Sequence, residues 1–112
     1  MIDIPCPCCG FLTFEEYYGS FEICSVCGWE DDGVQLANPT SAGGANKISL
    51  ADAQTDALKK YPLPLNLASG YYRASDWRPL NTNDTQAADK LRAANHWHTQ
   101  AVVSESEAYW RQ

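Results

Sequence analysis

Apolar positions in the first third of the chain come in short runs between polar turns, whereas later ones recur at helical spacing. Residues 11–14 and 21–24 are rich in β-forming side chains, and Gly19 lies in the stretch between them. This pattern predicts two antiparallel strands joined by a hairpin loop over residues 15–20. The turn-forming pairs Asn38-Pro39 and Gly43-Gly44 predict a loop over residues 33–47.

Two later segments have the apolar spacing of amphipathic helices. Ser49 can cap the start of the first, Pro62 ends it, and its apolar stripe consists of Leu50, Ala53, Ala57 and Tyr61. A second helix is predicted over residues 84–101, with one side formed by Ala87, Leu91, Ala94, His98 and Ala101. The prolines and the glycine within residues 62–83 predict irregular chain there, with a short strand at 71–73. Ser104 and Glu107 have the spacing of a capping box, which predicts a last short helix.

The strongest chemical signal is a pair of cysteine knuckles, each of the form C-x2-C-G, at residues 6–10 and 24–28. Two residues between thiolates let both sulfurs reach one ion about 2.3 Å away, and the glycine permits the tight turn. Soft thiolate ligands in a tetrahedral set suit zinc. The spacing therefore predicts one structural zinc ion held by Cys6, Cys9, Cys24 and Cys27. A single iron ion, as in rubredoxins, and a redox-sensitive metal site are the alternatives.

The remaining thiol and the two histidines do not extend this site. Cys8 lies at a variable position of the first knuckle, and we expect an unligated thiol that points away from the metal; ligand exchange and catalysis are the alternatives. His96 and His98 are two residues apart, hence about 200° apart around a helix, and cannot easily share an ion. Because the sequence offers no recognisable nucleophile and base, we expect no enzyme.

Charge is unevenly distributed. The net charge is −6, and the seven acidic residues before Lys47 precede the first Lys or Arg. Such a surface repels phosphate backbones and attracts basic proteins, so we expect a basic protein partner and no nucleic acid. The partner-binding face is predicted to consist of Glu15, Glu16, Glu30, Asp31 and Asp32. For residues 30–32, a solvated turn and a cation-binding site are the alternatives. Without a signal peptide or a long apolar run, we expect a cytoplasmic protein that does not contact membranes.

Three segments of the sequence resemble a known family. Residues 6–13 read CPCCGFLT, residues 23–32 read ICSVCGWEDD, and residues 43–50, which follow Asn38-Pro39, read GGANKISL. Through these three segments, the chain resembles the cysteine-rich CPCC family of small bacterial proteins over about residues 5–60. The resemblance implies a zinc-ribbon-like metal site that forms one unit with the acidic turn and the glycine-rich segment. By analogy with other small bacterial proteins, it suggests an immunity protein encoded beside a toxin.

We therefore predict an α+β fold in which a zinc-ribbon-like β-hairpin with two knuckles is followed by two or three helices packed on it. The chain is expected to form a single domain, residues 1–112, with the ribbon in 1–48 and a mainly helical and irregular remainder in 49–112. The predicted function is a non-catalytic zinc-binding protein-interaction module, an immunity protein that neutralises a basic nuclease-type toxin. The alternatives are a nucleic-acid-associated zinc-ribbon regulator and a redox or iron protein of the rubredoxin type.

Overall fold

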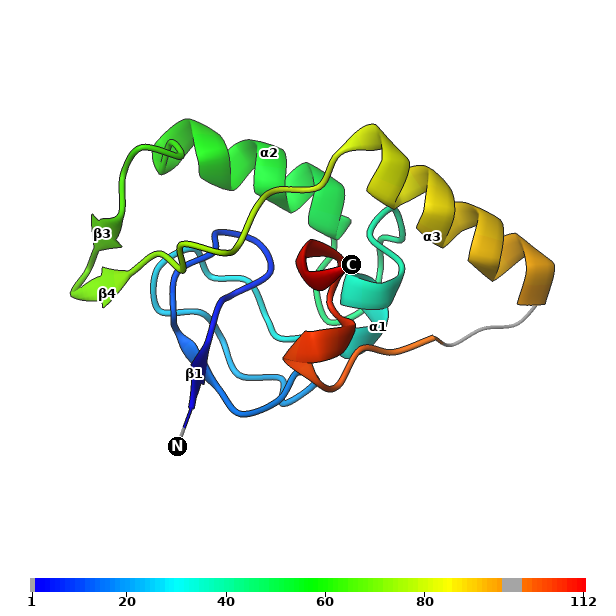
Figure 1. Cartoon of the computed structure of the whole chain (residues 1–112), viewed down its shortest axis with the longest axis horizontal. Coiled ribbons are helices and arrows are strands. Elements are labelled where there is room, and N and C mark those ends of the chain that lie inside the picture. Colours follow the sequence, from blue (N-terminus) through cyan, green and yellow to red (C-terminus); the bar gives the residue numbers. More distant parts are fainter. Residues whose placement is uncertain (1, 96–99) are drawn as a thin grey trace.

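A computed structural model describes residues 2–95 and 100–112 and confirms the α+β class (Figure 1). The helices are α1 (Gly33–Ala37), α2 (Leu50–Lys60) and α3 (Thr82–Asn95). The strands are β1 (Asp3–Ile4), β2 (Phe14–Glu15), β3 (Leu67–Ala68) and β4 (Tyr71–Tyr72), and the chain ends in the 3-10 turns η1 (Glu105–Glu107) and η2 (Tyr109–Arg111). In Figure 1, α2 and α3 lie along one side of the molecule, and the blue and cyan N-terminal loops lie beneath α2.

Strand pairing differs from the predicted hairpin. β2 pairs with β1, with Ile4 opposite Phe14, and not with residues 21–24. Residues 21–24 instead fold back on residues 29–31, where Cys24 N–H donates to the Trp29 carbonyl at 2.8 Å. The prediction that residues 11–14 and 21–24 form one hairpin is therefore wrong. The physical reason is that a C-x2-C-G knuckle itself reverses the chain, so the residues before it pair with those after it.

The predicted loop over residues 33–47 contains the short helix α1, which the sequence interpretation missed. Asp32 caps it, since its Oδ1 accepts from the backbone N–H groups of Val34 and Gln35 at 2.8 and 3.1 Å. The rest of the segment is irregular and is organised by the buried side chain of Gln35. Its Nε2 donates to three carbonyl oxygens of the loop, those of Ser41, Asn46 and Ile48.

Helix α2 is confirmed almost as predicted. Ser49 caps it by accepting from the Asp52 N–H at 3.2 Å, and the helix stops one residue before Tyr61. The stripe of Leu50, Ala53 and Ala57 is buried. The short strand β4 and the capping box of Ser104 and Glu107 are confirmed as well.

Helix α3 is shorter than predicted. It ends at Asn95, and residues 96–99, which include the predicted helix positions Trp97 and His98 as well as His96, lie outside the described residues. Gln100 and Ala101 are not helical. The prediction of a helix to residue 101 is wrong because the chain there bonds to the region of α1. Asn38 Nδ2 donates to the Gln100 carbonyl at 3.1 Å, and Val102 N–H donates to the Gly33 carbonyl at 2.9 Å.

One hydrophobic core joins both ends of the chain. It brings the first knuckle and Tyr18 together with α2, Trp77 and Trp110. The rings of Tyr18 and Trp110 meet edge to face at 6.0 Å, which attaches the C-terminal turn to the N-terminal loops. None of the helices in the described part of the chain has the length and apolar content that crossing a bilayer requires.

Candidate metal centre

The two cysteine knuckles have the same backbone geometry. In the first, Cys6 N–H donates to the Phe11 carbonyl and Gly10 N–H donates to the Cys6 carbonyl, both at 2.8 Å. In the second, the equivalent bonds run from Cys24 to Trp29 at 2.8 Å and from Gly28 to Cys24 at 3.0 Å. The glycines have φ values of 80° and 83°, in the region that side chains disfavour. The sequence repeat C-x2-C-G is thus a repeat in structure.

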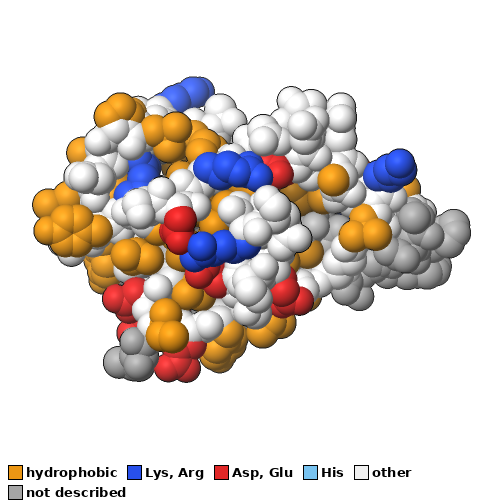
Figure 2. All heavy atoms as spheres, in the orientation of Figure 1, with side chains coloured by type: hydrophobic (Ala, Val, Ile, Leu, Met, Phe, Trp, Pro, Cys, Tyr) orange, Lys and Arg blue, Asp and Glu red, His pale blue; other side chains and the backbone are white. Residues whose placement is uncertain are grey.

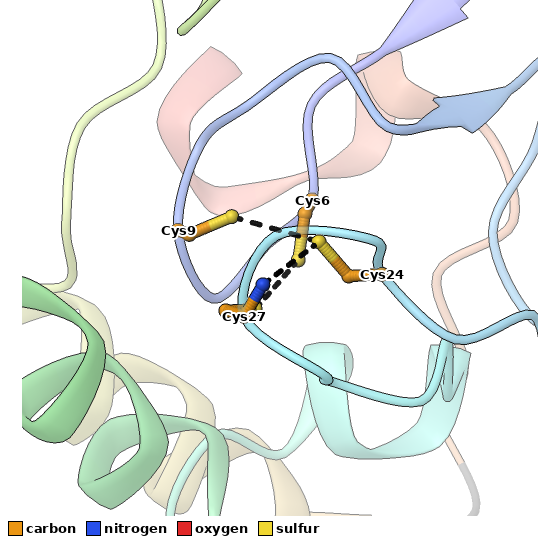
Figure 3. Close-up of side chains that lie close together, drawn as sticks. All are labelled: Cys6, Cys9, Cys24 and Cys27. Atoms are coloured by element: carbon orange, nitrogen blue, oxygen red, sulfur yellow. Dashed lines mark hydrogen bonds between the residues drawn. The ribbon is translucent and has the colours of Figure 1, made fainter. Parts of the chain in front are cut away.

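The four predicted ligand sulfurs converge on one point (Figure 3). All four lie within 4.8 Å of one another; the Sγ atoms of Cys6 and Cys27 are 3.7 Å apart, and those of Cys9 and Cys24 are 3.8 Å apart. Four sulfurs held tetrahedrally at about 2.3 Å from an ion are about 3.8 Å apart. All five cysteines are free thiols, not disulfides. The residues present therefore fit a tetrahedral metal ion.

Cys24 has the hydrogen bonds expected of a metal-bound thiolate. Its Sγ accepts from the Thr13 hydroxyl at 3.1 Å and from the backbone N–H groups of Val26 and Cys27 at 3.4 and 3.5 Å. Such bonds orient a ligand and stabilise its negative charge. Thr13 follows the first knuckle, so this bond also connects the two halves of the site.

The clustered thiols differ in their pKa values. Burial raises the pKa of Cys6 well above its ordinary value. By contrast, hydrogen bonds from the thiols of Cys24 and Cys6 hold the pKa of Cys27 far below its ordinary value. Four thiolates this close can all carry charge only when a cation compensates them, and a bound metal ion deprotonates its thiol ligands. The site is therefore chemically suited to a dication.

The surroundings of the knuckles differ. Every residue from Ile4 to Phe11 is buried, whereas Ser25 and Gly28 of the second knuckle are exposed and Cys27 is half-buried. Cys27 lines two shallow hollows of about 340 and 190 Å³. Solvent therefore approaches the site from the side of Cys27.

Cys8 does not join the four clustered sulfurs. Its side chain is nevertheless buried, with 3% exposed. A hydrogen bond with Cys27, followed by burial, raises the pKa of the Cys8 thiol. Cys8 is therefore a buried thiol beside a ligand, without belonging to the cluster.

The predicted acidic face does not exist as one surface. Glu15 and Glu16 are exposed and Glu30 is half-buried, but Asp31 and Asp32 are 1% and 6% exposed. Asp31 Oδ2 accepts from the Ser20 N–H and hydroxyl at 2.9 and 2.7 Å, and Asp32 caps α1. The assignment of Asp31 and Asp32 to an exposed partner-binding face is therefore wrong. Their carboxylates are acceptors for backbone donors of the fold.

Two residues that hold the knuckles in place were not predicted. Arg73 donates to four carbonyl oxygens, those of Cys9, Tyr61, Pro62 and Leu65. Its guanidinium also lies 4.4 Å from the ring centre of Phe11. No sequence pattern marked Arg73, because all its partners are backbone groups or a ring distant in sequence. Gln54 is different: it donates to the Pro7 carbonyl at 2.8 Å, and its position beside the apolar stripe of α2, between Ala53 and Ala57, was a signal that it would be buried.

The chain was also compared with known proteins. The model of the family described as cysteine-rich CPCC matches residues 4–61, just over half of the chain. Among curated proteins, none matches the chain. The matched region contains both knuckles, α1 and α2, and ends where the Arg73-bound loop begins.

Proposed function

The chain is a member of the cysteine-rich CPCC family, and we propose that it is a non-catalytic protein-binding module organised by one structural zinc ion. The observation that carries the metal part is the clustering of the Sγ atoms of Cys6, Cys9, Cys24 and Cys27, which all lie within 4.8 Å of one another. A complete set of four thiolates is typical of structural zinc sites, whereas catalytic sites keep a position open for water or substrate. When bound, the ion would offset part of the negative charge of the thiolates and join the two knuckles.

The experiment that tests the metal is elemental analysis of the purified protein, with absorption spectroscopy to detect iron. We expect one zinc per chain in the wild type and its loss in Cys9→Ser. Cys8→Ser is the matched control, because Cys8 lies beside the ligands without belonging to their cluster, and it should retain zinc. Iron with visible absorption would support the rubredoxin alternative. Metal loss in Cys8→Ser together with retention in Cys9→Ser would refute the ligand assignment.

The protein-binding part rests on charge. After Asp31 and Asp32 are removed from the predicted face, the exposed acids of the N-terminal region are Asp3, Glu15, Glu16 and Glu22. The first base of the sequence is Lys47. Figure 2 shows red acidic and orange apolar side chains side by side at the end of the molecule that carries the N-terminus, while the blue basic side chains lie toward the centre and the helices. A basic protein is the partner that such a surface attracts.

We further propose that this partner is a basic toxin domain of the nuclease type and that the chain is its cytoplasmic immunity protein. The charge of the surface and the small size of a chain with a four-thiol cluster support this. Co-expression with a toxin encoded beside the gene tests it: the wild type should rescue growth, and Glu15→Lys combined with Glu16→Lys and Glu22→Lys should not. Because these three side chains are exposed, the variant should still fold and bind metal. Equal rescue by the variant would refute the proposed role of charge.

A further inference from the structure

The second knuckle has a backbone edge that the fold leaves open. Ile23 and Glu30 are antiparallel partners, and the bonds on either side of them run from Cys24 N–H to the Trp29 carbonyl and from Asp31 N–H to the Glu22 carbonyl. In such a pair the backbone groups of the two opposed residues point away from each other, toward the outer edges. Each of the two residues therefore offers one N–H and one C=O to whatever lies beside it.

The edge at Glu30 is closed. Asn46 Oδ1 accepts from the Glu30 N–H at 2.9 Å, and Asn46 Nδ2 donates to the Glu30 carbonyl at 2.8 Å. The side-chain amide of Asn46 thus makes the two bonds that a neighbouring strand would make. No hydrogen bond to the N–H or C=O of Ile23 is found within residues 2–95 and 100–112.

The first knuckle shows that this opening is not a necessary feature of the motif. The residue equivalent to Ile23 is Pro5, which has no N–H, and its carbonyl accepts from the Tyr18 hydroxyl at 2.6 Å. Pro5 is buried, whereas 65% of Ile23 and 61% of Phe21 are exposed. Phe21 is also held at φ 62°, a conformation that an aromatic residue adopts rarely. The same backbone edge is therefore closed in one knuckle and presented with two large apolar side chains in the other.

We propose that this open edge, defined as the backbone of Ile23 with the side chains of Phe21 and Ile23, binds an extended, basic segment of a protein partner as an added β-strand. Main-chain bonds to Ile23 would supply the pairing, and the apolar side chains would select the residues that face them. The charge of the surroundings decides the class of segment, since Glu22 lies between the two apolar residues and Glu15 and Glu16 are exposed nearby in the chain. This inference rests on the protein-binding part of the proposed function and names its surface.

The test uses the full-length, zinc-loaded protein and two synthetic peptides, Lys-Val-Lys-Thr-Lys-Val-Lys and its counterpart with Glu in place of Lys. Amide hydrogen exchange is followed by NMR with each peptide at millimolar concentration. We expect the basic peptide to slow exchange of the Ile23 N–H at least fivefold and the acidic peptide to leave it unchanged. Protection should weaken as ionic strength rises, because exposed charges are screened over about 8–10 Å at physiological salt.

Two variants at one position separate backbone pairing from side-chain contact. Ile23→Pro removes the outward N–H, which makes no bond inside the described fold, and should weaken binding at least tenfold. Ile23→Val keeps the N–H and should bind the basic peptide as the wild type does. Metal content and the NMR spectrum check folding. If the proline variant does not fold, the effect of the basic peptide on exchange of the Ile23 N–H in the wild type decides whether the edge binds the peptide.

Four outcomes would overturn the inference. They are absence of binding, equal binding of both peptides, binding without protection of Ile23, and protection without any peptide at concentrations where the chain dimerises. In the last case a second copy of the chain would occupy the edge. These failures can be distinguished from failure of the proposed function by the toxin rescue experiment. If the Ile23→Pro variant still rescues growth, the chain is a protein-binding module that uses another surface.

Discussion

The two knuckles are a controlled comparison within one molecule: their C-x2-C-G spacing and backbone bonds match, but their surroundings do not. The first is enclosed by α2, Trp77 and Arg73 and belongs to the core, while the second forms the surface around Cys27. A knuckle motif therefore determines how its own residues hold a metal ion. The chain that packs against the knuckle determines whether the knuckle lies in the core or at the surface. Substitutions at equivalent positions should reveal this difference.

The largest expected effect is loss of a metal ligand, and it should differ between Cys6 and Cys27. Zinc thiolate sites contribute apparent free energies of about 10–16 kcal/mol at neutral pH, so both Cys6→Ser and Cys27→Ser should lower metal affinity strongly. Cys6→Ser should also abolish cooperative thermal unfolding, because Cys6 is fully buried whereas Cys27 is half-buried. Metal titration and calorimetry measure the two effects. Greater loss of structure in Cys27→Ser would contradict the comparison.

The next effect concerns the knuckle glycines. A Cβ added at Gly10 would lie 2.3 Å from the Trp77 ring, whereas one at Gly28 would meet nothing within 4 Å. Gly28→Ala should therefore cost about 1–2 kcal/mol for its left-handed backbone alone. Gly10→Ala should cost about 2–5 kcal/mol, since overpacking is added. Urea unfolding of the zinc-loaded variants measures both, and equal losses would show that Trp77 moves aside freely.

A smaller effect is expected from the side chains that hold each knuckle from outside. Arg73→Lys keeps the charge but cannot bond four carbonyls, and should cost about 2–3 kcal/mol. Asn46→Ala, at the second knuckle, should cost about 1–2 kcal/mol. Both variants should retain zinc. Denaturant midpoints measured at a fixed zinc concentration give the order, and a reversed order would refute the view that the first knuckle is held more firmly.

The smallest effect is the loss of the Tyr18 hydroxyl, which closes the edge at Pro5. Tyr18→Phe should cost about 1 kcal/mol at neutral pH. Burial, followed by the charge of Glu105, raises the pKa of Tyr18 above its ordinary value. A raised pKa in the folded state means that this stability is present below about pH 10, the unfolded value, and is lost as pH rises above it. The difference in stability between the wild type and Tyr18→Phe should therefore shrink above about pH 10, and a difference that stays constant there would contradict burial of the hydroxyl.

Local signals predicted local features well. The cap at Ser49, the apolar stripe of α2 and the capping box at Ser104 act over three or four residues, and all three are present. The ligand quartet could be predicted for the same reason, since spacing within each knuckle brings two sulfurs to one side. By contrast, strand pairing was predicted from adjacency of β-forming runs, and this prediction was wrong. β2 pairs with β1, and in each knuckle the first cysteine bonds to the residue that follows the glycine.

The sequence by itself determined the two knuckles, their four clustered thiols, α2 and the excess of acidic residues, because each depends on neighbouring residues or on composition. Only the tertiary structure decided which acids are exposed. Asp31 and Asp32 were drawn inward by backbone donors of Ser20, Val34 and Ala45. It also decided that the Tyr18 hydroxyl closes the edge at Pro5 and that the Asn46 amide closes the edge at Glu30, since these contacts join residues that no local pattern relates. Among the described residues, nothing bonds to the backbone of Ile23.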